Sequence, residues 1–170
     1  ASDEFKIYKS KDIAKKYDLV FICDYYMTTW AINPFSRDMV RQIAQTLLVL
    51  SKDYKILIRP RKKDLYYQDI YDVVGDNATY SLGDNRPSIY EDIKSAKLGM
   101  AAYTNGIKDG LLMNIPFLHF NYQNLNTTYI DILNDNLLYM SKNKEESIIK
   151  VNDFFENKLE KINFTKVNKK

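Results

Sequence analysis

The chain has 170 residues, 45% of them hydrophobic, which is enough for one well-filled α/β core and too few for two ordinary domains. Its 25 basic and 22 acidic residues are interspersed and give a formal charge of only +3, which gives no case for nucleic-acid binding. No apolar run approaches a membrane span, and no signal pattern opens the chain. We therefore expect a cytoplasmic protein, and peripheral membrane association stays open for the full-length protein.

The single cysteine, Cys23, lies in the apolar segment DLVFIC and has no internal disulfide partner, which suits a reducing compartment. A small buried side chain accounts for it better than a nucleophile does. The sequence has no Cys/His cluster with metal-ligand spacing and no Gly-x-Gly-x-x-Gly or Walker pattern. We therefore expect no metal and no cofactor, and dinucleotide oxidoreductases and NTPases have little support.

The first third of the chain predicts a strand, a loop and a helix after a polar lead at residues 1–16. Residues 17–23 form an apolar strand. Their exit, residues 24–33, is rich in polar and aromatic side chains and is a candidate binding loop. An Asn-Pro pair then supplies a cap and a helix-starting proline, and apolar residues recur at helical spacing up to Ser51.

The middle of the chain continues this alternation. Residues 54–59 predict a second buried strand, residues 65–74 a helix, and residues 77–82 a short third strand. Ser88 can then cap a helix that runs directly into an interior strand at residues 98–103. The pattern so far is typical of strand-helix-strand units.

The last third repeats the unit. Thr104 or Asn105 can cap a short helix that ends before Pro116, and residues 116–120 form the next strand. Residues 137–140 predict a sixth short strand. A parallel sheet follows from strands joined in this way by helices.

The carboxyl-terminal part predicts one long helix and a tail. Asn143 and Glu146 have the spacing of a capping pair, and the apolar face that follows extends to Ile162. Residues 166–170 are expected to be a solvated tail.

Alternation throughout predicts an α/β fold: a Rossmann-like parallel sheet of about five or six strands, with helices on both faces and right-handed crossovers. We expect a single domain over residues 17–165. The loops at the carboxyl ends of the strands then converge on one edge, where open sheets bind ligands. These loops are residues 24–33, 60–63, 82–87 and 103–106.

The turn at Thr104, Asn105 and Gly106 is the first candidate anion site. The first amides of a helix have no partner within it and carry the positive end of the helix dipole. Gly106 lets a ligand approach the backbone, and Asp109 would accept hydrogen bonds from sugar hydroxyls. The alternative is structural: Thr104 or Asn105 merely caps, and Asp109 merely complements the dipole.

A basic segment follows the second strand at the same edge. Arg59, Arg61, Lys62 and Lys63 lie within reach of a phosphate-sized ligand, and arginine grips phosphate through two parallel hydrogen bonds. Such a run is more often a solvated turn or the start of a helix. Its place on the same edge as the Thr104 turn favours an anion site.

The segment YTNGIKDGLLMNIPFLHF resembles one in the CDP-glycerol glycerophosphotransferase and capsule polysaccharide transferase group. There a strand ends in Tyr-Ser-Ser, an Asp follows, and Lys-Pro precedes the next strand. Upstream, ILIRPRKKD resembles that group's strand and Arg-Pro-His-Pro turn. The matching positions are Tyr103, Thr104, Asn105, Asp109, Pro116, Arg59 and Pro60.

The resemblance implies the C-terminal, donor-binding half of a GT-B glycosyltransferase, in which a nucleotide-activated sugar or polyol phosphate binds and surface polysaccharide is made. By this analogy Thr104, Asn105 and Gly106 hold the donor diphosphate and Asp109 the ribose. Arg59 or Arg61 holds phosphate charge, and residues 86–90 lie near the base. The N-terminal acceptor domain is missing from these residues, so the catalytic residues are unknown and little activity is expected from the chain alone.

The sequence departs from that group where chemistry would be most direct. Thr104 and Asn105 replace the serine pair, and Arg61 replaces the expected histidine. The only histidine, His119, lies in an apolar strand and is expected to be a core or edge residue rather than a general base.

Two other functions stay open. The first is a non-catalytic α/β module that binds a partner through the aromatic loop with Tyr25, Tyr26 and Trp30. A sugar-nucleotide epimerase half shares the two-domain architecture, but it would require carboxylates and a histidine aimed at the sugar.

Overall fold

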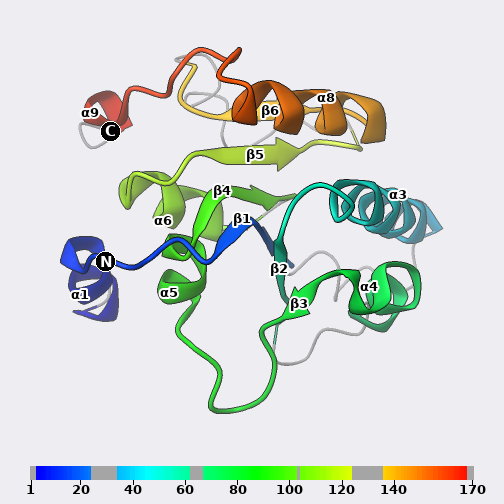
Figure 1. Ribbon diagram of the computed structural model, residues 1–170, viewed down its shortest axis with the longest axis horizontal. Helices are drawn as coiled ribbons and strands as arrows, with labels where there is room; N and C mark the ends of the chain where they lie inside the picture. The colour runs from blue at the N-terminus through cyan, green and yellow to red at the C-terminus, as the bar shows by residue number, and fades with distance from the viewer. Residues whose placement is uncertain (1–2, 24–33, 62–66, 103, 124–135, 168–170) are drawn as a thin grey trace.

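The structure is a computed structural model, and it describes residues 3–23, 34–61, 67–102, 104–123 and 136–167. Its centre is a six-stranded sheet in which every pair of neighbouring strands is parallel, with the order β3-β2-β1-β4-β5-β6 (Figure 1). The predicted Rossmann-like α/β class is therefore confirmed. The strands are β1 (Tyr17–Ile22), β2 (Ile56–Arg59), β3 (Thr79–Tyr80), β4 (Ala96–Ala101), β5 (Phe117–Phe120) and β6 (Tyr139–Ser141).

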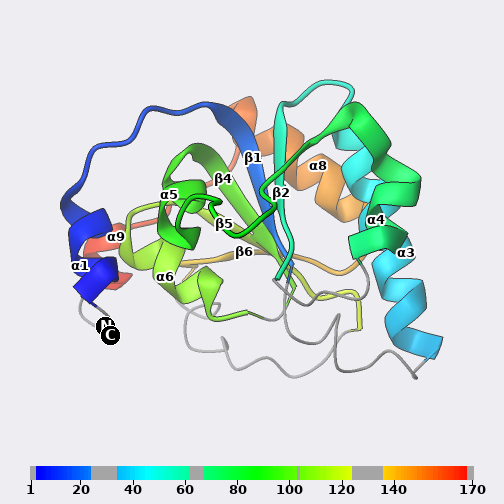
Figure 2. The same ribbon diagram turned by 90° about the horizontal axis from the view of Figure 1, so that it is seen from below.

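Helices cover both faces of the sheet, as Figures 1 and 2 both show. One layer contains α3 (Pro34–Leu50), α4 (Tyr67–Val74) and α8 (Lys144–Phe155). The opposite layer contains α1 (Asp3–Ser10), α5 (Ile89–Lys94), α6 (Gly106–Leu112) and α9 (Phe164–Val167). A 3-10 turn, η1 (Gly75–Asn77), follows α4.

Two apolar cores lie between the sheet and these layers. Along the central strand β1, Leu19 and Phe21 join the core under α3, while Val20 and Ile22 join the core under α6. All four side chains are at most 2% exposed. A strand buried on both faces reads as an apolar run, which is why the segment LVFIC predicted an interior strand.

Helix α1 occupies the segment that the sequence predicted as a polar lead. Its one buried side chain, Phe5, packs edge-to-face on Tyr90 of α5 with ring centroids 5.5 Å apart. Lys94 of α5 extends its ammonium to carbonyl groups at the end of α1, including that of Tyr8 at 2.9 Å. Contacts distant in sequence therefore position α1.

The C-terminal prediction needs a second correction, because α8 ends at Phe155 rather than continuing to Ile162. Asn157 has a φ of 56°, and the Lys158 amide donates to the Asp153 carbonyl at 2.8 Å, which is a helix-terminating turn. The chain then runs across to α9. Val167 in α9 is only 7% exposed, so the predicted solvated tail begins inside a packed helix. We call residues 156–163 the C-terminal strap.

One aromatic ring fixes how α6 lies on the sheet. Phe117 of β5 is fully buried between Gly99 of β4 and Gly110 of α6. A Cβ atom built on Gly99 would lie 2.3 Å from this ring, and one built on Gly110 would lie 2.1 Å from it. Both distances are far below van der Waals contact, so the two glycines provide the space that the ring fills.

We therefore expect Gly110→Ala to lower the free energy of unfolding by about 1–3 kcal/mol, because overpacking outweighs the better helix propensity of alanine. The control is Gly106→Ala in the same helix, where a Cβ would meet nothing closer than 3.6 Å. Urea unfolding measures both. Equal midpoints for the two variants would contradict this account of Phe117.

Candidate functional site

The order of the strands reverses between β1 and β4. From β1 the chain proceeds outward to β2 through α3, and from β4 it proceeds the other way to β5 through α6. The two connecting helices lie on opposite faces of the sheet (Figure 2). The carboxyl edge at such a reversal is where open α/β sheets bind ligands.

The predicted turn after β4 lies at this reversal. The Thr104 hydroxyl accepts a hydrogen bond from the Gly106 amide at 3.3 Å, and the Thr104 carbonyl accepts one from the Ile107 amide at 3.2 Å. Asn105 is exposed, and its side chain makes no capping bond. Of the two candidate caps, Thr104 therefore bonds the start of α6, and the Asn105 side chain points to solvent-accessible space.

Gly106 joins this turn to the end of β1. A Cβ atom built on Gly106 would lie 3.6 Å from Ile22 Cγ2 and 3.6 Å from the Thr104 side chain, which is ordinary van der Waals contact. Packing therefore does not require glycine here, in contrast to Gly99 and Gly110. Gly106 is itself buried, so a side chain here would lie on the inner side of the turn, between Ile22 and Thr104.

Asp109 lies in the first turn of α6. Its side chain is half-buried, and burial raises the pKa of this carboxyl above its usual value. A half-buried carboxylate has lost part of its hydration, so a hydrogen-bond donor that replaces the lost water stabilises its charged form. A sugar hydroxyl is such a donor.

Arg59, at the end of β2, is engaged inside the protein. Its Nη1 donates to the Asp92 carboxylate of α5, to the Pro87 carbonyl at 2.7 Å and to the Ser81 hydroxyl at 3.3 Å. The Arg59 side chain is 11% exposed and that of Asp92 is 5% exposed. Arg59, which the sequence predicts to bind phosphate, therefore also connects β2 to α5 through a nearly buried ion pair.

Arg86 is a second guanidinium in this region, and the sequence interpretation placed it only near the base. Its Nη1 donates to the Pro60 carbonyl at 2.5 Å and to the Ser81 carbonyl at 3.1 Å. Burial, and then the neighbouring Arg59 charge, lower the pKa of Arg86. The pairing of Arg86 with the loop after β2 depends on tertiary structure, so sequence spacing gave no signal for it.

Arg61 is exposed just beyond β2. Since β1 separates β2 from β4, the ends of these two strands lie about 10 Å apart. The arginines and the Thr104 turn therefore share one edge of the sheet without direct contact between their strands. Other predicted residues of this edge lie outside the described part of the chain, namely Tyr25, Tyr26, Trp30, Lys62, Lys63 and Tyr103.

His119 is a core residue, as predicted. It is fully buried in β5 beside Ala101, and desolvation lowers its pKa to about 4, although the nearby backbone of Ala102 and Ala101 acts the other way. The imidazole is thus neutral at pH 7. Cys23 is likewise buried, at 2% exposure.

Membrane-spanning helices and metal-binding clusters are both absent from the described residues. No helix there is long and apolar enough to cross a membrane. No group of three or more His, Cys, Asp or Glu side chains there is arranged to hold a metal ion.

The Arg59–Asp92 pair predicts a stability difference between buried and exposed ion pairs. Asp92→Asn leaves Arg59 without its carboxylate in a nearly buried setting, and we expect a loss of about 3 kcal/mol in the free energy of unfolding. The control is Asp3→Asn, whose partner Lys6 is 70% exposed, with an expected loss below about 0.5 kcal/mol. Urea unfolding decides, and similar small losses in both variants would refute a structural role for the pair.

His119 predicts a pH dependence. Between pH 6.5 and about 4, His119 is protonated in the unfolded chain but neutral in the folded protein. We therefore expect the free energy of unfolding to fall by about 3 kcal/mol as pH is lowered through this window. Above pH 6.5 this group should have no effect on it. His119→Gln removes the titrating group. Unfolding midpoints measured at several pH values should therefore diverge between wild type and variant below pH 6.5, and parallel curves would contradict the assignment.

Comparisons with known proteins give the fold but no family. No family model and no curated protein matches the sequence. Among solved structures, a UDP-GlcNAc 2-epimerase from Methanocaldococcus jannaschii matches 95% of this chain with a TM-score of 0.65 and 12% identity. One from Neisseria meningitidis, bound to UDP-GlcNAc, matches 90% with a TM-score of 0.60 and 12% identity.

A protein from Listeria monocytogenes to which the same activity is assigned matches 93% of this chain, with a TM-score of 0.61 and 12% identity. The matched parts are 44%, 39% and 40% of the respective neighbours, in the order M. jannaschii, N. meningitidis, L. monocytogenes. The chain therefore spans about two fifths of the length of these structures. At this identity the likeness shows a shared fold: the chain folds like one part of these sugar-nucleotide enzymes.

Proposed function

We propose that this chain binds a nucleotide-activated sugar or polyol phosphate at the carboxyl edge of its sheet. The observation that carries the proposal is the turn at residues 104–106. It follows β4 at the reversal of strand order, contacts the end of β1, and contains a glycine that packing does not require. The chain shares its fold with sugar-nucleotide enzymes, one of which has UDP-GlcNAc bound, and this likeness supports the proposal.

In this proposal the donor diphosphate lies against the turn at Thr104, Asn105 and Gly106, where the Gly106 amide also bonds the Thr104 hydroxyl. Asp109 accepts hydrogen bonds from the ribose hydroxyls. Arg61 is exposed and contributes positive charge to the edge. The charge of Arg59 is largely matched by Asp92, so Arg59 supports the edge by holding β2 against α5. Hydrogen-bond donors and cations that are already in position stabilise the negative charge of a bound diphosphate.

For the reaction, we propose transfer of the activated sugar or polyol phosphate in surface polysaccharide synthesis, as the resemblance to the CDP-glycerol glycerophosphotransferase group implies. Donors at the diphosphate would stabilise the charge that develops on the leaving nucleotide. An acceptor and a base would come from an N-terminal acceptor domain beyond these residues. A cytoplasmic location belongs to the same proposal.

Epimerisation of a UDP-sugar is the second candidate, and the activity of the structural neighbours favours it. Against it stands His119. The chain's single histidine is fully buried in the core, so it does not supply an imidazole to a sugar at the edge. Any proton-transfer histidine would belong to another part of a longer protein.

Isothermal titration tests the binding site. We expect saturable binding of UDP-GlcNAc or CDP-glycerol, weakened at least tenfold by Asp109→Asn and by replacing Thr104 and Asn105 together with alanine. Asp69→Asn, on the exposed side of α4, is the matched control and should bind as wild type does. Circular dichroism checks that each variant is folded.

The remaining outcomes separate the candidates. CDP-glycerol as the preferred ligand favours the transferase, and NMR detection of a C2 epimer formed from UDP-GlcNAc favours the epimerase. No heat with either ligand, together with a concentration-dependent mass in sedimentation, would reject nucleotide binding in favour of a partner-binding module.

A further inference from the structure

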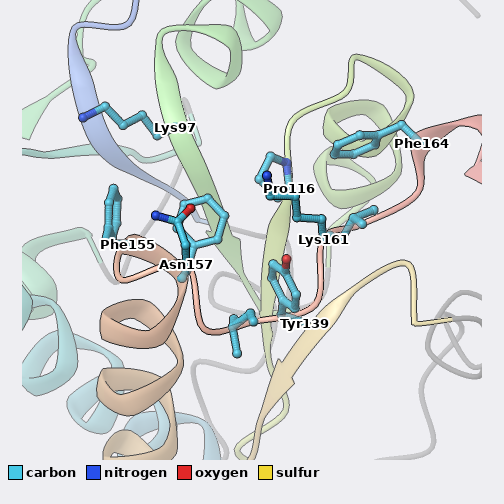
Figure 3. A pocket seen from close by; sticks show the side chains of 10 residues that line it. Lys97, Pro116, Tyr139, Phe155, Asn157, Lys161 and Phe164 are labelled. Carbon is cyan, nitrogen blue, oxygen red and sulfur yellow. The ribbon is translucent and has the colours of Figure 1, made fainter.

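A groove lies at the amino edge of the sheet, on the side opposite the candidate nucleotide site. It has a volume of about 520 Å³ and lies between the starts of β4, β5 and β6, the end of α8 and the C-terminal strap (Figure 3). Its walls include the rings of Tyr139, Phe154, Phe155 and Phe164. This volume is in the range of sites for small organic ligands.

The fold builds this groove through the strap. At Asn157 the left-handed backbone turns the chain out of α8, so residues 158–163 cross the edge of the sheet instead of extending the helix. The Tyr139 hydroxyl donates to the Glu160 carbonyl at 2.9 Å, and Ile162 is seated in the core at 8% exposure. The strap is thus anchored at two points, and the hollow remains between it and the strands.

The aromatic walls hold one another in place. Phe154 contacts Phe155 edge-to-face with centroids 5.1 Å apart, and it contacts Tyr139 in the same way at 6.1 Å. Phe155 also stacks on Tyr54 at 4.6 Å. Yet the rings of Tyr139, Phe154, Phe155 and Phe164 all stay partly exposed. Covering exposed apolar side chains lowers the free energy, and little ordering cost is added when the side chains are already held in place. The exposed rings therefore favour binding of an apolar ligand.

The charge of the lining is one-sided. It contains two lysines, Lys97 and Lys161, and no carboxylate. The Lys97 ammonium lies 2.8 Å from Asp18 and 5.8 Å from the centre of the Phe155 ring, so its charge is largely matched. Lys161 is exposed, and Figure 3 shows its side chain extending over the groove toward Pro116. It is the cation available to an anionic group in the groove.

We propose that this groove binds a small hydrophobic molecule that carries one anionic group, such as an aromatic carboxylate or sulfonate. The apolar part lies against the rings of Tyr139, Phe154 and Phe164, and the anionic group pairs with Lys161. The site is separate from the nucleotide site, because it lies at the amino ends of the strands rather than at their carboxyl ends. It does not rest on the proposed function.

Titration with the aromatic sulfonate 1-anilinonaphthalene-8-sulfonate, followed by its fluorescence, tests the proposal on the folded chain. We expect saturable binding at one site, at least fivefold weaker in Lys161→Gln. The matched control is Lys166→Gln, an exposed lysine of α9 that does not line the groove, which should bind as wild type does. The neutral analogue N-phenyl-1-naphthylamine should bind wild type and Lys161→Gln equally.

Four results would overturn the proposal. The first is the absence of saturable binding, and the second is equal affinity in the two lysine variants. The third is displacement of the probe by UDP-GlcNAc, which would locate it at the carboxyl edge. The fourth is loss of probe binding at concentrations where sedimentation shows a doubled mass, which would identify a second copy of the chain as the occupant.

Discussion

The reversal of strand order between β1 and β4 is the constraint on which the candidate site depends. The chain leaves these neighbouring strands toward opposite faces of the sheet. The turn after β4 thereby brings the start of α6 against the end of β1, where Gly106 lies next to Ile22. The same arrangement places the arginines at the end of β2 on one edge with that turn. The chemistry proposed for this edge follows from topology first and from individual side chains second.

Much of the fold was predictable because each β-strand of the interior is an apolar run and each connecting helix has an apolar stripe. The segments that were wrong have physical reasons. Helix α1 is short and buries one side chain, Phe5, while its other aliphatic residue, Ile7, is exposed, so its sequence has no clear apolar face. The end of α8 was missed because Leu159 and Ile162 continue the helical spacing, although Asn157 turns the backbone into the left-handed region.

The site was predictable in part. The turn at Thr104, Asn105 and Gly106 could be located because it is contiguous in sequence and the strand before it is strongly apolar, while its binding role stays a prediction. The partner of Arg59 could not, since Asp92 is 33 residues away and the pair forms only when α5 packs beside β2. The groove at the amino edge has no local pattern either, because its walls come from the starts of three strands, from α8 and α9, and from the strap.

The ring of Phe117 has a consequence for how this chain can change over generations. It occupies space vacated by Gly99 on the strand and Gly110 on the helix, so these three positions share a single fixed volume. A methyl group gained at either glycine has to be matched by atoms lost from the aromatic side chain. Descendants of this sequence should therefore vary at the three positions together, and selection from a randomised library should recover compensating triplets rather than isolated replacements.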